Sequence, residues 1–174
     1  MAKFNPKQKI NPFLWFDDQA EEAAKFYVTL FSKRKGAAKK SKIISVMRYM
    51  EDDKNSGKKK GSVLCVYFTL EGQEFVALNG GPLFKFNESV SFVINCKTQT
   101  EVDYFWNKLI ADGGEESMCG WLKDKYGLSW QVTPTILIDM MIDKNTKKAS
   151  RVMQVMMTQR KIEIEPLKKA FNQK

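Results

Sequence analysis

The chain has 174 residues, of which 43% are hydrophobic, and its formal net charge at pH 7 is +9. A chain of this length can bury one substantial core, and we predict a single domain over residues 1–174. The sequence contains no histidine. This absence excludes Ser-His-Asp and Cys-His nucleophiles and removes the commonest protein ligand of zinc, iron and nickel.

The positive charge is concentrated in two stretches, residues 33–42 and 54–60, where basic residues are mixed with glycine and serine. A basic surface of this kind suits nucleic acid. No aromatic residue lies within either stretch, however, so neither can stack on an exposed base. We interpret both stretches as solvated loops and predict no nucleic-acid partner.

The three cysteines, Cys65, Cys96 and Cys119, are widely spaced and include no CxxC pair. This usage is typical of a reduced protein, and we predict a cytoplasmic location. The apolar run at residues 13–16 is too short for a signal peptide or a membrane span, so no membrane association is predicted.

The first half of the chain predicts one helix among several strands. After the apolar run at residues 9–16, apolar residues recur at helical spacing through residues 20–31. Asp18 precedes this helix and Glu21 follows three positions later, which predicts that Asp18 caps its N-terminus. The acidic residues here are therefore interpreted as a helix start rather than a metal site.

Three strands follow this helix. Residues 42–50 and 62–70 have strand character, and Glu71-Gly72 predicts a hairpin turn into a strand at residues 73–78. Asn79-Gly80-Gly81-Pro82 ends that strand. The first half therefore predicts the order β-α-β-β-β.

The same order is predicted again in the second half. Residues 89–96 have strand character, and residues 98–110 form a helix that opens with a Thr98-x-x-Glu101 capping box. Residues 114–134 then predict two or three short strands joined by tight turns.

The last of these strands has the clearest pattern. Apolar and polar residues alternate from position 128 to position 133, which places Ser129, Gln131 and Thr133 on one face and Trp130 on the other. We predict that Trp130 lies in the core. The polar face is the one that a concave sheet would turn toward a ligand.

Internal similarity supports a duplication. In the two helices Glu22, Phe26, Tyr27 and Leu30 recur 79 positions later as Glu101, Phe105, Trp106 and Leu109. The Gly72 segment recurs at Gly127, which is 55 positions later, so the first copy carries the longer, lysine-rich insertion.

After Pro134 the chain becomes helical. Helices are predicted at residues 135–143, 146–159 and 165–171, and their apolar faces are rich in methionine, which adapts to irregular surfaces. These helices either pack on the outer face of the sheet or form a dimer contact.

Four segments together resemble a known superfamily: LWFDDQAEEAAKFYVTLF, FVALNGGP, SVSFVINCKTQTEVDYFW and CGWLKDKYGLSWQVTP. The chain is similar, over residues 10–171, to the vicinal oxygen chelate superfamily of glyoxalase, bleomycin-resistance and extradiol dioxygenase proteins. Within it the chain resembles the PhnB-like group, also labelled a 3-demethylubiquinone methyltransferase family.

The resemblance implies an α+β fold in which two tandem βαβββ modules form a cup-shaped, eight-stranded mixed sheet. It places the first module at residues 9–82, the second at residues 88–134 and a C-terminal helical extension at residues 135–174. It also implies a homodimer.

The resemblance further implies where a metal would be bound. The superfamily's ligand positions, on the first and last strands of each module, correspond to Ile10, Val76, Ser89 and Gln131. These side chains offer one amide and one hydroxyl, whereas a divalent transition metal requires three or more imidazole, carboxylate or thiolate groups. We predict no metal.

The methyltransferase label also lacks support from a motif. An S-adenosylmethionine site usually needs a glycine-rich turn between a strand and a helix, and Gly80-Gly81 leads into Pro82 instead. We predict no cofactor.

The predicted ligand site lies inside the cup. Strand alternation directs Ser89 and Ser91 inward, and subtracting 79 places Leu14 and Phe16 there as well. Trp121 suits either the core or the rim, and Gln131 suits either a ligand or a side chain of a neighbouring strand. The predicted ligand-binding residues are Gln131, Ser89, Ser91, Leu14, Phe16, Val76, Leu78 and Trp121.

These observations lead to one leading hypothesis and one alternative. The leading hypothesis is a metal-free protein that binds a small organic ligand in an apolar cup with a few polar groups. The alternative is an enzyme of the same superfamily, a lyase, a transferase or the labelled methyltransferase, whose reaction is unidentified.

Overall fold

The structure is a computed structural model that describes residues 7–34, 36–37 and 40–173. It divides into two compact units, residues 1–85 and residues 86–174. The predicted modules fall one in each unit, and the helical extension belongs to the second. Of the predicted basic loops, Lys35 and Lys39 lie outside the described residues.

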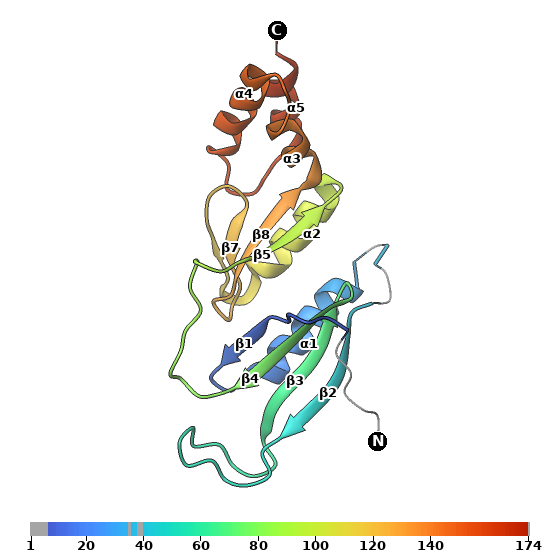
Figure 1. Ribbon diagram of the computed structural model, residues 1–174. Coiled ribbons are helices and arrows are strands. Elements are labelled where there is room, and N and C mark those ends of the chain that lie inside the picture. The colour runs from blue at the N-terminus through green and yellow to red at the C-terminus, as the bar shows by residue number, and fades with distance from the viewer. Residues whose placement is uncertain (1–6, 35, 38–39, 174) are drawn as a thin grey trace. The chain divides into compact units, whose positions relative to one another are not determined.

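The first unit is a four-stranded mixed sheet with one helix (Figure 1). The strands pair in the order β1-β4-β3-β2, with β1 parallel to β4 and the other pairs antiparallel. The hairpin turn predicted at Glu71-Gly72 joins β3 to β4, and both residues have positive φ angles. The elements are β1 (Phe13–Phe16), α1 (Ala20–Ser32), β2 (Lys42–Arg48), β3 (Val63–Leu70) and β4 (Gln73–Asn79).

The second unit repeats this arrangement with the strand order β5-β8-β7-β6, again with one parallel pair, β5 and β8. The predicted α+β class with two tandem βαβββ modules is thus confirmed as two four-stranded mixed sheets. The elements are β5 (Phe92–Cys96), α2 (Gln99–Leu109), β6 (Glu115–Glu116), β7 (Trp121–Lys123) and β8 (Ser129–Pro134), followed by α3 (Thr135–Met141), α4 (Thr146–Met156) and α5 (Ile164–Asn172).

An aromatic stack holds α1 against the first sheet. Tyr27 and Phe68 are fully buried, and their ring centroids are 6.4 Å apart. Phe75 continues the stack, 5.4 Å from Phe68. Burial of such large rings stabilises the packing of α1 on the sheet.

The predicted cap at Asp18 is wrong. The residue before α1 is Gln19, and its side chain makes no capping hydrogen bond. Instead the Oδ1 of buried Asn79, at the end of β4, accepts a hydrogen bond of 2.8 Å from the backbone N–H of Ala20. The sheet therefore supplies the cap that the local sequence does not, and this fixes where α1 starts.

The capping box predicted for α2 is confirmed. The backbone N–H of Glu101 donates to Thr98 Oγ1, at 3.2 Å, and the Glu101 carboxylate accepts from the backbone N–H of Lys97 at 2.6 Å. Local sequence is sufficient here because donor and acceptor are three or four residues apart.

The C-terminal helices α3, α4 and α5 pack around a small core of their own. Side chains from all three helices, and from the segment before α5, are buried together: Leu137, Met140, Val152, Ile162 and Leu167. Gln99 of α2 joins this group to the module, because its Oε1 accepts a hydrogen bond of 2.9 Å from the backbone N–H of Ile164.

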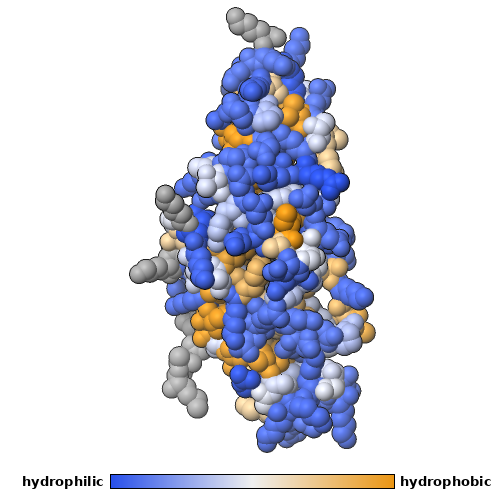
Figure 2. Space-filling view, turned by 180° about the vertical axis from the view of Figure 1, so that it is seen from behind, coloured by the Kyte–Doolittle hydropathy of each residue, from blue (hydrophilic) through white to orange (hydrophobic). Residues whose placement is uncertain are grey.

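Hydrophilic residues dominate the molecular surface visible in Figure 2, with hydrophobic patches between them. No helix within the described ranges is long and apolar enough to cross a membrane.

Candidate functional site

The second sheet has one face against α2 and one open face. Strand pairing places Val93 of β5 and Trp121 of β7 beside Gln131 of β8, and Lys123 beside Ser129. Because side chains alternate along a strand, these five share the open face. The other face carries buried apolar side chains such as Ile94, Leu122, Trp130 and Val132.

A cleft of about 160 Å³ lies on this open face, toward its β6 and β7 edge. Trp121 supplies an aromatic wall, and the remaining lining is mostly polar or charged. The lining residues are Glu88, Glu115, Glu116, Ser117, Trp121, Leu122, Lys123 and Ser129.

Ser129 is the most informative residue of this cleft. Its side chain is only 1% exposed, and its Oγ has no hydrogen-bond partner among the described residues. A buried hydroxyl without a partner costs about 1–3 kcal/mol, and native proteins rarely leave one unpaired without a reason. The hydroxyl is therefore available to a molecule that occupies the cleft.

An Asp124-centred turn positions Ser129. The buried Asp124 carboxylate accepts hydrogen bonds from the backbone N–H groups of Tyr126 and Leu128, at 2.9 and 3.1 Å, and from Trp130 Nε1 at 2.8 Å. These bonds fix both ends of the β7–β8 hairpin. They hold Trp130 on the α2 side, so the preceding residue faces the cleft.

An ion pair borders the cleft. Lys123 Nζ is paired with the Glu88 carboxylate, which brings the segment before β5 to β7. This hydrogen bond raises the pKa of Lys123 and lowers that of Glu88, so both groups are charged at neutral pH.

Gln131 and Ser91 lie together at the β5–β8 pair. Gln131 Nε2 donates a hydrogen bond of 2.9 Å to Ser91 Oγ. Of the two roles considered for Gln131, the structure shows the contact with a neighbouring segment. A ligand contact of the same side chain stays a prediction.

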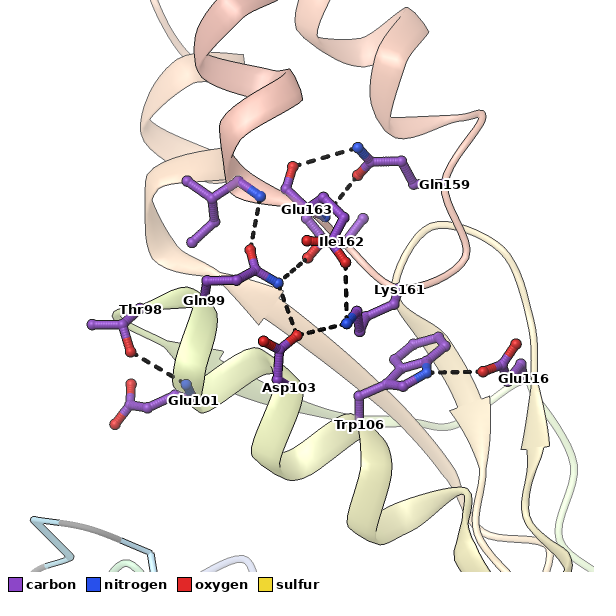
Figure 3. A network of polar contacts seen from close by, with 11 residues as sticks. Thr98, Gln99, Glu101, Asp103, Trp106, Glu116, Gln159, Lys161, Ile162 and Glu163 are labelled. Atoms are coloured by element: carbon purple, nitrogen blue, oxygen red, sulfur yellow. Dashed lines mark hydrogen bonds and ion pairs between the residues drawn. The ribbon is translucent and has the colours of Figure 1, made fainter.

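The C-terminal extension contacts the segment between Ser117 and Trp121, two residues that line the cleft. The carbonyls of Gln159 and Arg160 accept hydrogen bonds from the backbone N–H groups of Cys119 and Gly120, at 2.7 and 2.8 Å. These two acceptors immediately precede a polar network around Lys161, Asp103 and Gln99, in which Lys161 Nζ lies 2.7 Å from Asp103 Oδ1 (Figure 3).

This network predicts a pH dependence. Burial by itself raises the pKa of Asp103. The hydrogen bonds from Lys161 and Gln99 lower this pKa by more than burial raises it, so it lies below its ordinary value of 3.8. A carboxyl whose pKa is lowered by folding stabilises the native state above its unfolded pKa, and this contribution is lost as pH falls through the folded pKa. Asp103→Asn should therefore reduce the free energy of unfolding at pH 7 by less than about 1 kcal/mol, because the pair is partly exposed.

The test is urea unfolding of both proteins as a function of pH. The difference between wild type and Asp103→Asn should disappear in acid, below the ordinary pKa of 3.8. A difference that stays constant from neutral pH into strong acid would show that the carboxylate charge does not stabilise the extension. The raised pKa of Lys161, caused first by its hydrogen bond with Asp103, is the alkaline counterpart, and its contribution is lost only as pH rises above 10.5.

Ser89 is not where the sequence pattern placed it. The strand β5 begins at Phe92, and Ser89 lies in the turn before it, exposed, with its backbone N–H and hydroxyl both bonded to Asn87 Oδ1. Alternation was extended too far toward the N-terminus. Ser89 therefore does not share the strand face of Gln131.

Leu14 and Phe16 were also assigned to the wrong face. They pair with Ala77 and Asn79, and Asn79 caps α1, so they lie buried on the helix side of the first sheet. Three residues separate β1 from α1, but two separate β5 from α2. The offset in the strands is consequently 80 (94 − 14), whereas that in the helices is 79. A shift of one residue moves a strand's side chains to the opposite face.

Val76 and Leu78 do lie on the open face of the first sheet. Pairing places Phe13 beside Val76 and Trp15 beside Leu78, so these aromatic residues replace Leu14 and Phe16 as neighbours. Of the predicted ligand-binding residues, Gln131, Ser91 and Trp121 are thus neighbours in the second unit, while Val76 and Leu78 belong to the first.

A larger cleft of about 360 Å³ lies near the starts of α2 and α5. Its central polar side chain, Gln99, is already engaged, since Oε1 accepts from Ile164 and Nε2 donates to Asp103 and to the carbonyl of Ile162. No buried unpartnered group was found there among the described residues. This cleft is therefore the weaker candidate.

Sequence reasoning missed Lys123, Glu115 and Glu88 as site residues, and it left Ser129 outside the predicted set. The alternation of Ser129 with Gln131 along β8, the second strand of the β7–β8 hairpin, was a sufficient signal for Ser129. Lys123 could have been identified by pairing the two strands that flank the turn, because this pairing places Lys123 opposite Ser129. Nothing local indicates Glu88, which reaches the cleft through a tertiary ion pair.

The chain matches a family described as 3-demethylubiquinone-9 3-methyltransferase over residues 8–133, so the match ends before α3. A solved structure described as a putative 3-demethylubiquinone-9 3-methyltransferase, PhnB protein, from Bacillus cereus is 38% identical, with a TM-score of 0.61. The match covers 74% of this chain and 100% of that one.

A second solved structure, protein PA1353 from Pseudomonas aeruginosa, is 17% identical with a TM-score of 0.57 and shares the fold. That match covers 74% of this chain and 98% of the other. No protein of curated function matches the chain. The chain therefore belongs to the 3-demethylubiquinone-9 3-methyltransferase family, the PhnB-like group of the vicinal oxygen chelate superfamily.

Proposed function

We propose that this protein binds a small organic molecule on the open face of its second module without a metal ion. The observation that supports this most strongly is the buried Ser129 hydroxyl, which lines the cleft and has no partner among the described residues. Trp121 offers apolar and aromatic surface beside it. A pocket with apolar walls and a few placed polar groups is the usual composition of a small-ligand site.

The positions that the superfamily uses for a metal do not fit one here. Ile10 and Val76 carry no donor atom, Ser89 lies in an exposed turn, and the Gln131 amide is bonded to Ser91. Within the described residues no group of three or more cysteine, aspartate or glutamate side chains could hold a metal ion. We therefore base the proposal on binding by organic groups alone.

The glycine pair does not form a cofactor loop. The backbone N–H groups of Gly80 and Gly81 donate to the carbonyls of Phe16 and Asp17, and a Cβ at Gly80 would lie 2.3 Å from the Trp15 ring. Close packing against Trp15 accounts for Gly80, and no helix follows it. These residues do not fit S-adenosylmethionine.

An enzyme of the same superfamily is the second candidate. The Bacillus cereus relative is described as a putative methyltransferase, and that activity is a property assigned to that protein. The homodimer, the cytoplasmic location and the lack of a nucleic-acid partner remain predictions from the sequence and the resemblance.

The test is a fragment screen followed by ¹⁵N NMR. Neutral, acidic and basic fragments are added to the protein while the signals of the Trp121 indole and the Ser129 amide are recorded. We expect some fragments to shift both signals, with no change on adding EDTA. The Trp121→Ala variant should lose this binding, whereas Phe84→Ala, which removes an exposed aromatic side chain of the first unit, should retain it.

Two results would contradict the proposal. One is that no fragment of any charge shifts the two signals. The other is binding that EDTA abolishes, because this would show that a metal ion holds the fragment.

A further inference from the structure

The cleft is acidic although the chain is basic. Its lining contains three carboxylates, Glu88, Glu115 and Glu116, and one ammonium group, Lys123. The formal charge of the lining is therefore −2, in a chain whose net charge is +9. A local charge of the sign opposite to that of the whole molecule indicates a specific electrostatic preference.

The contacts of the three carboxylates show which of them carries the negative charge that is not already engaged by another side chain. Glu88 is paired with Lys123. Glu116 accepts a hydrogen bond of 3.1 Å from Trp106 Nε1 and lies 3.9 Å from Arg160. The Glu115 carboxylate is exposed at the cleft and has no hydrogen bond or ion pair of its own among the described residues. Its strand partner is Lys123, whose pKa is raised first by the hydrogen bond with Glu88 and also by the charge of Glu115. The negative charge left for a ligand is thus that of Glu115.

Two further groups of the cleft suit a cation that carries N–H donors. The face of a tryptophan ring attracts an ammonium group more strongly than the other aromatic side chains do, and Trp121 lines the same cleft. The unpartnered Ser129 Oγ can accept a hydrogen bond from that ammonium group. The lack of a partner for this buried hydroxyl is an observation that does not depend on the charges of the cleft.

We propose that the cleft formed by Glu115, Trp121 and Ser129 selects small organic cations, with a primary ammonium group attached to a compact apolar or aromatic body. This inference rests on the proposed function and adds the chemical class of the ligand. Strand pairing sets Glu115, Lys123 and Ser129 in one row on this face, and the ammonium group of Lys123 is paired with Glu88. The ligand's ammonium group contacts the Glu115 carboxylate and Ser129 Oγ across this row, and its apolar body packs on Trp121.

An anionic ligand fits less well. Among the described lining residues Lys123 is the only cation, and its charge is already paired with Glu88. An anion at Lys123 would displace Glu88 and would approach Glu115. Like charges in such proximity destabilise binding.

The test uses three probes with the same ring and different charge: benzylammonium, benzyl alcohol and benzoate. Each is titrated into the full chain while the Trp121 indole and Ser129 amide signals are followed. We expect benzylammonium to bind at least about tenfold more tightly than benzoate, with an affinity that falls as salt is added.

Charge variants test the role of Glu115. Glu115→Gln should weaken benzylammonium binding by about fivefold and leave benzyl alcohol unchanged, because an exposed ion pair contributes little more than this. Glu51→Gln is the matched control, since it changes the net charge equally at an exposed residue of the first unit. Ser129→Ala should weaken both probes that can donate a hydrogen bond.

The outcomes separate the two proposals. If benzyl alcohol or benzoate shifts the Trp121 signal as strongly as benzylammonium does, or if Glu115→Gln has no effect, the preference for cations is wrong and a small-molecule site remains. If none of the probes and no fragment of the wider screen shifts it, both proposals are wrong.

Discussion

Replacing Asp124 by alanine is expected to reduce the free energy of unfolding by about 3–5 kcal/mol. Its carboxylate is 2% exposed and accepts hydrogen bonds from two backbone N–H groups and from the Trp130 indole. Removing it takes the carboxylate acceptor from two buried donors and one half-buried donor, and each bond to a charged group contributes about 1.5–3 kcal/mol. Partial access of water to the opened turn reduces the sum. Chemical denaturation followed by tryptophan fluorescence measures the loss.

Two variants give the comparison. Asp139→Ala removes an exposed aspartate of α3 and should change the free energy by less than about 0.5 kcal/mol. Asp124→Asn keeps one acceptor oxygen but sets an N–H₂ group against an N–H donor, so it should have an intermediate effect. If Asp124→Ala were as mild as Asp139→Ala, the turn would not depend on this carboxylate.

Replacing Gly120 by alanine is expected to cost about 2–4 kcal/mol. Gly120 has a φ angle of +81°, and a Cβ there would lie 2.9 Å from the carbonyl oxygen of Val132 and 3.1 Å from Ile162 Cγ1. The left-handed conformation costs a residue with a side chain about 1–2 kcal/mol, and the collision with backbone adds to it. Because Gly120 also bonds to Arg160 of the extension, the same change should displace Trp121 and weaken binding in the cleft.

Gly127 provides a matched control for this substitution. Its φ angle is +82°, nearly that of Gly120, but a Cβ there would meet no atom within 4 Å. Gly127→Ala should therefore cost only the conformational part, about 1–2 kcal/mol. Equal losses in the two variants would show that the close approach of Val132 and Ile162 does not exclude a side chain at Gly120. Unfolding in urea, monitored by circular dichroism, distinguishes the two results.

The Asp124 turn shows where local sequence is informative and where it is not. The string from Asp124 to Gly127 indicates a turn, and the alternation after it places Trp130 in the core, both of which the structure confirms. The hydrogen bond from the Trp130 indole to Asp124 cannot be read from the string, because it depends on how β7 and β8 pair.

The two faces of β1 show more clearly what local sequence cannot predict. The repeat was detected correctly, yet one additional residue between β1 and α1 exchanged the inward and outward sets, so Leu14 and Phe16 were misplaced. The cap of α1 failed for a related reason. Asp18 is the nearest candidate along the chain, but Asn79 is the nearest in space.

The sequence by itself determined the elements, their order, the duplication and the absence of a histidine-based site, because periodicity, turn residues and composition are properties of neighbouring positions. Only the tertiary structure decided which side chains meet. Ser129, Lys123 and Glu88 come together through strand pairing and an ion pair between distant segments, and burial leaves the Ser129 hydroxyl without a partner among the described residues. The physical reason is that a strand position has two faces, and one residue of register selects between them.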